Sequence, residues 1–277
     1  MTERLDMASV FEMIPLCSGS SGNSILVRVL GMNILFDCGI SCKRIVEALG
    51  KVGTDPTEID AMFLSHSHSD HISGADVFVR KYFTDIYATK ETMRSFLSVC
   101  KKEHSRELDH EIDGEVVFKT VKGNVTVIAC KTPHDTAGSV CFKVCCAGKS
   151  IMIMTDLGHV TDEIRALAKG VDGILIESNY DYEMLITGPY DYALKRRVEG
   201  PYGHLSNEDC AQMIKELIDS GTKSFILGHL SENNNVPDLA LNTVVDYLAS
   251  FGLHKEKDYC LEVARRYEPS DPMVVFA

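Results

Sequence analysis

Apolar runs of strand length alternate along the chain with stretches of helical periodicity. Short apolar runs bounded by Gly, Asp or Ser predict buried strands, and they cover residues 10–16, 24–30, 32–39, 59–66, 115–121, 124–132, 139–146, 150–158, 173–178 and 223–230. Apolar residues at helical spacing predict helices over 43–52, 74–83, 192–198, 207–221 and 236–252. Because strands are followed by helices in both halves, we expect helices packed outside two sheets, an α/β architecture.

Composition is that of an ordinary globular protein. Hydrophobic residues make up 45% and charged residues 25% of the 277 residues, which is enough to bury a substantial core. The chain has no low-complexity segment, no linker rich in Pro or Ser and no short repeat. We therefore expect one domain over residues 1–277. No run approaches the roughly 18 apolar residues that a membrane span requires.

Cysteine usage and the N-terminal residues predict a cytoplasmic protein. The first twenty residues lack a basic segment followed by a long apolar stretch, so we predict no signal peptide. The ten cysteines are then expected to be reduced thiols. A formal net charge of −12 argues against non-specific binding along a nucleic-acid backbone. It does not exclude a polyanionic substrate, since bound metal reverses the local field.

A dense histidine cluster, "SHSHSDH" at 65–71, follows the apolar run at 61–64. Alternation along an extended segment places His66 and His68 on the same side, and Asp70 and His71 can face that space after a change of direction. A polar surface loop is the alternative. We favour metal binding, because neutral imidazoles are natural ligands for zinc and similar metals.

Three further candidate ligands stand where other apolar runs end. They are His134, Asp156 and His229. Any one of them alone is typical of a capping or packing residue, but together with the cluster they predict a common rim. One carboxylate among several imidazoles fits two metal ions that share a bridging ligand.

The ordered set of "SHSHSDH", His134, Asp156 in "MTDLG" and His229 in "LGHLSENN" resembles the motifs of the metallo-β-lactamase fold. The resemblance spans most of the chain, from residue 17 to residue 234. It implies a four-layer αβ/βα sandwich of two mixed β-sheets with helices outside and a metal site along one edge. This agrees with the order of strands and helices above.

The resemblance also implies roles for the candidate ligands. One metal would be held by His66, His68 and His134 and a second by Asp70, His71 and His229, with Asp156 bridging both. Asp37 in "ILFDCG" matches an acidic motif that orients a ligand imidazole from outside. An Asp that simply forms a turn before Cys-Gly is the alternative for this position.

Other motifs narrow the resemblance to one branch. These are "CSGSSGNS", "ESNYD", "GPYDYALKRR" and "GHLSNED", which look like the WalJ (YycJ) group of bacterial exonuclease-like proteins. More distant similarity is to ribonuclease Z, ribonuclease J and cyclic-phosphate phosphodiesterases. A bridging aspartate, rather than a cysteine, resembles the hydrolases of phosphodiesters and thioesters more than the true β-lactamases.

Phosphodiester hydrolysis needs an activated water, charge neutralisation and help for the leaving oxygen. Two metals lower the pKa of a bridging water toward neutrality, and Asp70 can orient the resulting hydroxide. His204 in "YGHLSN" can donate to a phosphoryl oxygen or protonate the leaving group. The neighbouring Ser206 is better explained as a helix cap.

Two basic or polar segments are ambiguous. The run Lys195, Arg196 and Arg197 offers phosphate contacts, since guanidinium groups grip phosphate bidentately, but a solvated helix face explains each residue singly. The loop "CSGSSGNS" at 17–24 offers hydroxyls and amides to an anion, or forms a turn between strands.

The sequence is compatible with three functions. The leading hypothesis is a dinuclear metal phosphodiesterase that acts on nucleic-acid ends, with DNA favoured, as an exonuclease. A thioester or lactone hydrolase of the glyoxalase II kind shares HxHxDH and a bridging aspartate, and a non-catalytic metal-binding regulator is the third. Histidine-rich ligation suits zinc, while the resemblance implies manganese, with iron also used at related sites. The sequence predicts neither the strand polarity nor the oligomeric state.

Overall fold

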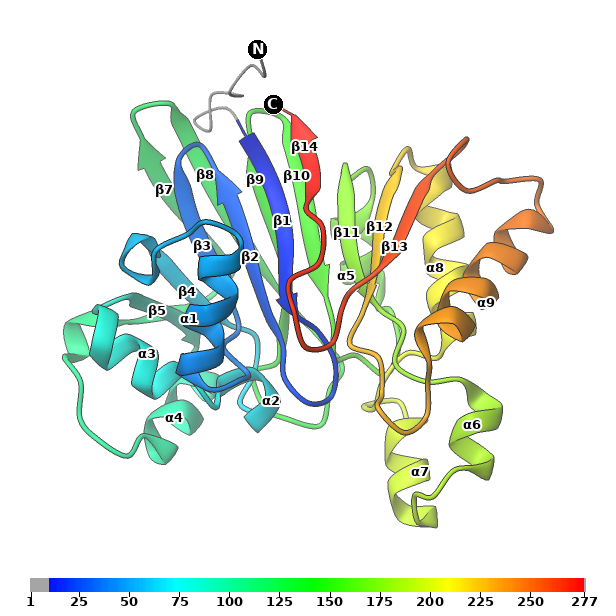
Figure 1. Cartoon of the computed structure of the whole chain (residues 1–277), viewed down its shortest axis with the longest axis horizontal. Helices are drawn as coiled ribbons and strands as arrows, with labels where there is room; N and C mark the ends of the chain where they lie inside the picture. The colour runs from blue at the N-terminus through cyan, green and yellow to red at the C-terminus, as the bar shows by residue number, and fades with distance from the viewer. Residues whose placement is uncertain (1–9, 277) are drawn as a thin grey trace.

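The computed structural model describes residues 10–276 and consists of two seven-stranded sheets that face each other, with helices on the outside (Figure 1). Figure 1 shows α1, α3 and α4 on the outer side of one sheet and α5, α8 and α9 on the outer side of the other. The predicted αβ/βα sandwich is therefore confirmed.

The first sheet has the strand order β14-β1-β2-β3-β4-β5-β6. Neighbours from β14 to β3 pair antiparallel, and those from β3 to β6 pair parallel. Its strands are β1 (Val10–Cys17), β2 (Ser24–Val29), β3 (Met32–Phe36), β4 (Ala61–Leu64), β5 (Asp85–Thr89), β6 (Asp109–Ile112) and β14 (Met273–Phe276).

The second sheet has the order β13-β12-β11-β10-β9-β8-β7. Neighbours from β13 to β10 pair parallel, and those from β10 to β7 pair antiparallel. Its strands are β7 (Glu115–Thr120), β8 (Gly123–Lys131), β9 (Val140–Cys146), β10 (Lys149–Met154), β11 (Gly173–Glu177), β12 (Ser224–Gly228) and β13 (Cys260–Val263).

The α-helices alternate with strands or groups of strands along the chain. Two of them, α6 and α7, project beyond the sheets at one end of the molecule (Figure 1). The helices are α1 (Cys42–Lys51), α2 (Ser69–Ile72), α3 (Ala75–Tyr82), α4 (Lys90–Val99), α5 (Asp162–Ala168), α6 (Tyr182–Thr187), α7 (Tyr192–Val198), α8 (Asn207–Asp219) and α9 (Pro237–Ala249). Short 3-10 turns, η2 (Pro56–Glu58) and η3 (Arg106–Leu108), precede β4 and β6.

Three apolar clusters fill the three interfaces between the four layers. In β3, Ile34 and Phe36 enter the cluster between the sheets, whereas Leu35 enters the cluster under α1, α3 and α4. In β4, Phe63 and Met62 divide in the same way. Because successive strand side chains point to opposite faces, strands covered on both sides are apolar throughout. This explains why the sequence shows them as continuous apolar runs.

Within residues 10–276, no helix is both long and apolar enough to cross a membrane.

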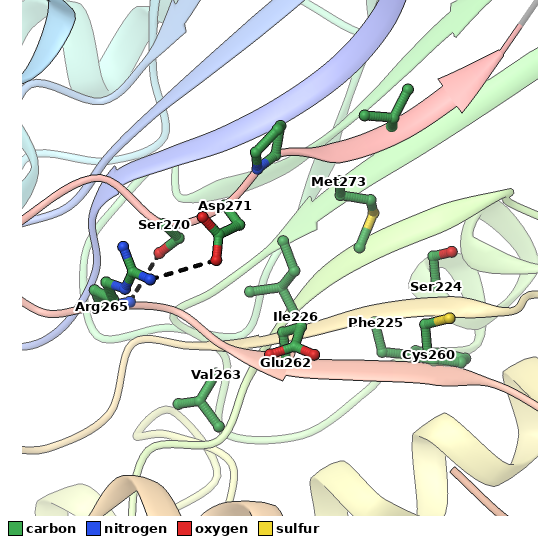
Figure 2. Close-up of a pocket in the computed structure, with 12 residues that line it drawn as sticks. Ser224, Phe225, Ile226, Cys260, Glu262, Val263, Arg265, Ser270, Asp271 and Met273 are labelled. Carbon is green, nitrogen blue, oxygen red and sulfur yellow. Dashed lines mark hydrogen bonds and ion pairs between the residues drawn. The ribbon is translucent and has the colours of Figure 1, made fainter. Parts of the chain in front are cut away.

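A cavity of about 280 Å³ lies where β12 and β13 of one sheet approach β14 of the other (Figure 2). Its floor is apolar and includes Phe225, Ile226 and Met273, and at its rim Arg265 pairs with Asp271 at 3.3 Å. None of the predicted metal-binding or catalytic side chains lines it. The predicted chemistry therefore belongs elsewhere in the molecule.

All ten cysteines are unpaired, in agreement with the expectation of reduced thiols. We expect thiol titration of denatured, unreduced protein to find all ten free. In the native protein the exposed Cys260 should react first, whereas buried Cys17, whose pKa burial raises to about 12, should resist modification at pH 8. Recovery of several stable disulfides would contradict the prediction and indicate an oxidising compartment.

Candidate metal centre

The predicted ligands meet at one end of the sandwich because each follows the end of a strand. The histidine cluster lies in the segment that leads from β4 into α2, His134 follows β8, Asp156 follows β10 and His229 follows β12. Five of the seven predicted ligands are less than a tenth exposed, and the other two, His68 and Asp70, line one cavity. The structure thus brings together residues that are up to 163 positions apart in the sequence.

Three imidazole nitrogens converge at the first position. The His68 Nδ1 atom lies 3.2 Å from His66 Nε2 and 3.2 Å from His134 Nε2. Ligands held about 2.0–2.1 Å from a tetrahedral ion are separated by roughly 3.3 Å, so the observed spacing suits one divalent cation.

A second set of donor atoms lies beside the first. The Asp70 Oδ2 atom is 3.5 Å from His71 Nε2 and 3.4 Å from His229 Nε2. The three ligand atoms lie within 4.8 Å of one another. This arrangement again suits one cation.

Asp156 lies between the two sets. Its Oδ1 atom is 3.7 Å from His134 Nε2 and 3.5 Å from His229 Nε2, and its Oδ2 atom is 3.2 Å from His71 Nε2. The carboxylate is buried, and Oδ2 has no hydrogen-bond partner with acceptable geometry. A buried carboxylate oxygen without a partner is costly unless a cation satisfies it. The donor set therefore fits divalent metal.

The outer nitrogen of each buried imidazole is held by an acceptor. His71 Nδ1 donates to Asp37 Oδ2 at 2.7 Å, and His134 Nδ1 donates to the Gly203 carbonyl at 3.1 Å. His66 Nδ1 lies 2.9 Å from the Ser65 hydroxyl, which itself donates to Asp37. In each of these rings Nδ1 is the nitrogen that faces an acceptor, which leaves Nε2 directed toward the centre as the nitrogen that can bind a metal.

Asp37 lies outside the two sets of candidate ligands and is hydrogen-bonded to the histidine cluster. Its carboxylate accepts hydrogen bonds from His71, from the Ser65 backbone amide and from the Ser65 hydroxyl. Its contacts are to the residues of the histidine cluster, so turn formation alone does not account for it.

Glu177, at the end of β11, was not identified from the sequence as a site residue. Its fully buried carboxylate accepts hydrogen bonds from His229 Nδ1 at 2.7 Å and His204 Nδ1 at 2.8 Å through Oε1. Its Oε2 accepts from the backbone amides of Leu157 and Leu205, each at 3.2 Å. The available signal was an acidic residue at the end of a wholly apolar run, because Asp156 also follows closely on such a run.

Asp135 is a second residue that sequence reasoning missed. Its Oδ1 atom lies 3.4 Å from His68 Nε2, and its other oxygen pairs with Arg197. His68 therefore presents Nδ1, rather than Nε2, toward its two partner histidines. The signal here was only that Asp135 follows a predicted ligand.

The buried carboxylates of the cluster favour the presence of positive charge beside them. Burial lowers the pKa of His66 well below its ordinary value, which keeps that imidazole neutral. Burial acts in the same direction on His71 and His229, but the surrounding carboxylates, led by Asp156, outweigh it. They raise the pKa of His71 well above its ordinary value and that of His229 to about 10. Protons balance these carboxylates in the free protein, and bound cations supply the same balance.

Three of the seven non-glycine residues that have a positive φ angle, among the described residues, lie in this cluster. Asp37, Asp156 and His229 have φ angles of 60°, 60° and 54°, a left-handed conformation that is unfavourable for residues other than glycine. Each residue directly follows or closely follows a strand end, and the sharp turn directs its side chain back into the cluster. Such strain is characteristic of functional sites.

The loop after β3 presses closely on the histidine cluster. A Cβ on Gly39 would lie 1.7 Å from the Asp70 carbonyl oxygen, so only glycine fits this contact. The Asn23 amide donates to the same carbonyl at 2.8 Å, and the Ser18 hydroxyl accepts from the His229 amide at 2.9 Å. The segment "CSGSSGNS" therefore braces the site.

His204 lies beside the ligands with one nitrogen available. Its Nδ1 is held by Glu177, and its side chain is 19% exposed at a cavity of about 320 Å³. The cavity is lined by Ser20, His68, Ser69, Asp70, Asp156, Asn179, Tyr190, Leu194, Arg197, Val198, His204, His229 and Ser231. Ser206 caps α8, as expected, because its hydroxyl accepts from the Asp209 amide.

The structure brings only Arg197 of the basic run to the residues that line this cavity. Lys195 Nζ donates to the Ile186 carbonyl at 2.6 Å, and Arg196 pairs with Glu199 at 3.0 Å. Lys195 therefore contacts α6 and Arg196 pairs with a residue next to its own helix, so neither side chain lines the cavity.

Comparison with known proteins gives one consistent result. A family model described as beta-lactamase superfamily domain matches residues 32–230. The chain is 35% identical to exodeoxyribonuclease WalJ of Streptococcus pneumoniae, over 90% of this chain and 92% of that protein. It is 30% identical to exodeoxyribonuclease YycJ of Bacillus anthracis, over 93% of this chain and 94% of that protein. The crystal structure of the metallo-beta-lactamase fold protein YhfI from Bacillus subtilis superimposes on this chain with a TM-score of 0.68 and 16% sequence identity. The superposition covers 94% of this chain and 99% of that protein.

Proposed function

Because the chain belongs to the beta-lactamase superfamily and, within it, to the family of the WalJ and YycJ exodeoxyribonucleases, we propose that it is a metal-dependent hydrolase of phosphodiester bonds at DNA ends. The observation that carries the proposal is the pair of donor sets around Asp156, whose buried Oδ2 lacks a hydrogen-bond partner. Two cations in such a pair are the arrangement used for in-line displacement at phosphorus.

In this proposal His66, His68 and His134 hold one ion, and Asp70, His71 and His229 hold the other. Asp156 is shared between them. The imidazole-rich donor set suits zinc and also accepts manganese or iron, since affinity order alone does not decide occupancy. When bound, the two ions supply an activated water and neutralise charge on the phosphate.

The chain's own side chains supply the remaining steps. Asp70, which lines the cavity and belongs to the second set, orients the attacking water through its carboxylate. His204 Nε2 donates a proton to the leaving oxygen, while Glu177 accepts a hydrogen bond from the opposite nitrogen and fixes the orientation of the ring. The Arg197 guanidinium binds a non-bridging phosphate oxygen at the cavity rim.

The same proposal places the enzyme in the cytoplasm, where its ten free thiols stay reduced. We also propose that residues 1–277 form one domain.

An activity panel on metal-reconstituted protein tests the function. The panel comprises a generic phosphodiester, single- and double-stranded DNA and RNA labelled at the 5′ or 3′ end, and a glutathione thioester. We expect turnover of the generic phosphodiester and stepwise release of nucleotides from one DNA end. Thioester turnover without phosphodiester turnover would overturn the proposal.

Substitution of Glu177 by glutamine is expected to weaken metal binding about 10–100-fold, as loss of a residue that orients a ligand does. All four groups that contact the Glu177 carboxylate are N–H donors, two at each oxygen. In either orientation the NH₂ of the introduced glutamine therefore faces two donors and cannot accept their hydrogen bonds. Competition with a chromophoric chelator measures the affinity, with circular dichroism to check the fold.

Glu183→Gln, on the exposed surface of α6, serves as the matched control for that substitution. Unchanged affinity in Glu177→Gln would show that the carboxylate does not orient His229.

A further inference from the structure

One wall of the site cavity is apolar, although metal binding does not require it. Tyr190, Leu194 and Val198 line the cavity together with His204 and Asp70. Tyr190 lies between α6 and α7, and the other two lie on α7. The cavity therefore combines the polar metal centre with a patch of aromatic and aliphatic surface.

This wall is rigidly supported from behind. Tyr180, Leu185 and Val198 form a small buried cluster, separate from the three clusters of the sandwich, and Tyr190 and Leu194 pack against it. The Tyr190 hydroxyl accepts a hydrogen bond from Asn233 Nδ2 at 3.3 Å, which fixes the ring from its far end. An aromatic face held in this way is ready to receive a flat partner without loss of side-chain entropy.

We propose that this wall, with Tyr190 at its centre, binds the base of the nucleotide next to the scissile bond. The inference rests on the proposed phosphodiesterase function and names the part of the substrate that the cavity recognises. A volume of about 320 Å³ is at the lower end of small-ligand pockets, so the cavity accommodates one nucleotide rather than a length of duplex. The phosphate then faces Arg197 and His204 while the base lies on the wall.

The chemistry of the wall favours stacking over base reading. Base–aromatic stacking is tolerant of sequence because every base has a π-face. The side chains of Leu194 and Val198 have no hydrogen-bonding groups, and the Tyr190 hydroxyl is held at the end of the ring by the hydrogen bond that it accepts from Asn233. We therefore expect all four bases to be accepted at this position.

Two p-nitrophenyl esters with the same leaving group test the inference. One is the p-nitrophenyl ester of thymidine 5′- or 3′-monophosphate, whichever is hydrolysed faster, and the other is methyl p-nitrophenyl phosphate. The measured quantity is the ratio of their kcat/KM values. In Tyr190→Ala this ratio should fall about 5- to 150-fold, the effect of losing one stacked base.

Tyr190→Phe keeps the ring and should retain most of the wild-type ratio. Tyr192→Ala is the matched control, because Tyr192 is the first residue of α7, is 79% exposed and does not line the cavity. A ratio unaffected by Tyr190→Ala, while both esters are hydrolysed, would overturn this inference alone. Absence of turnover with both esters in the wild-type, metal-loaded protein would overturn the proposed function and the inference with it.

Discussion

Replacement of Asp156 by alanine should weaken the binding of both metal ions and lower phosphodiester turnover about 10³-fold, as much as the loss of one preorganised electrostatic contact at a reacting centre. Asp156 is the one carboxylate within 4.0 Å of histidines from both donor sets, among the described residues. Without Asp156, the first cation would be held by imidazoles alone. The second would keep a single carboxylate ligand, Asp70. Both ions should then bind more weakly.

Elemental analysis checks this expectation directly. Wild-type protein should carry about two metal ions per chain, and Asp156→Ala should carry fewer under the same dialysis. Asp162→Ala, which removes an exposed carboxylate from the first turn of α5, should keep both ions. A wild-type protein with only one tightly held ion, retained after loss of Asp156, would contradict the bridged pair.

Strands buried on both faces could be predicted from the sequence, whereas the two short edge strands β6 and β13 could not. β3, β4, β10 and β11 are nearly continuous apolar runs because helices cover one face and the opposing sheet covers the other. β6 ("DHEI") and β13 ("CLEV") are four-residue strands at the sheet edges, and half or more of their residues are polar or exposed. Their pairing depends on partners far away in the chain, so local periodicity does not reveal them.

The candidate ligands were identifiable because histidine and aspartate at strand ends are few and chemically distinctive. Glu177 was not, because its role arises from hydrogen bonds to His204 and His229, 27 and 52 residues away. Asp135 depends in the same way on His68, 67 positions earlier in the sequence. Contacts of this range are decided by how the strand ends meet, which spacing along the chain does not specify.

The basic run shows the same limit within one helix. Lys195, Arg196 and Arg197 are adjacent, yet successive residues on a helix point about 100° apart. Only the direction of α7 relative to the cavity decides that Arg197 faces Asp135 and the site.

Loss of His204 should separate chemistry from metal binding. In the proposed ligand sets both ions have their full protein ligands without His204, so His204→Ala should keep its metal content and its fold. Turnover of a DNA phosphodiester should fall about 10²–10⁴-fold, the usual contribution of general acid–base help. The geometry behind this expectation is the Nδ1 contact with Glu177 at 2.8 Å, which leaves Nε2 for the substrate.

The leaving group distinguishes the two roles open to His204. A p-nitrophenyl ester leaves with little need for protonation, so its hydrolysis should suffer much less than that of DNA if His204 donates a proton. His159→Ala is a suitable control, because this exposed histidine bonds the Pro201 carbonyl and does not line the cavity. An equal loss on both substrates would instead identify His204 as a phosphate-binding group, and unchanged activity on both would remove it from the site. Loss of a metal ion in His204→Ala would show that the ligand assignment is wrong, because a residue outside both sets should not control their occupancy.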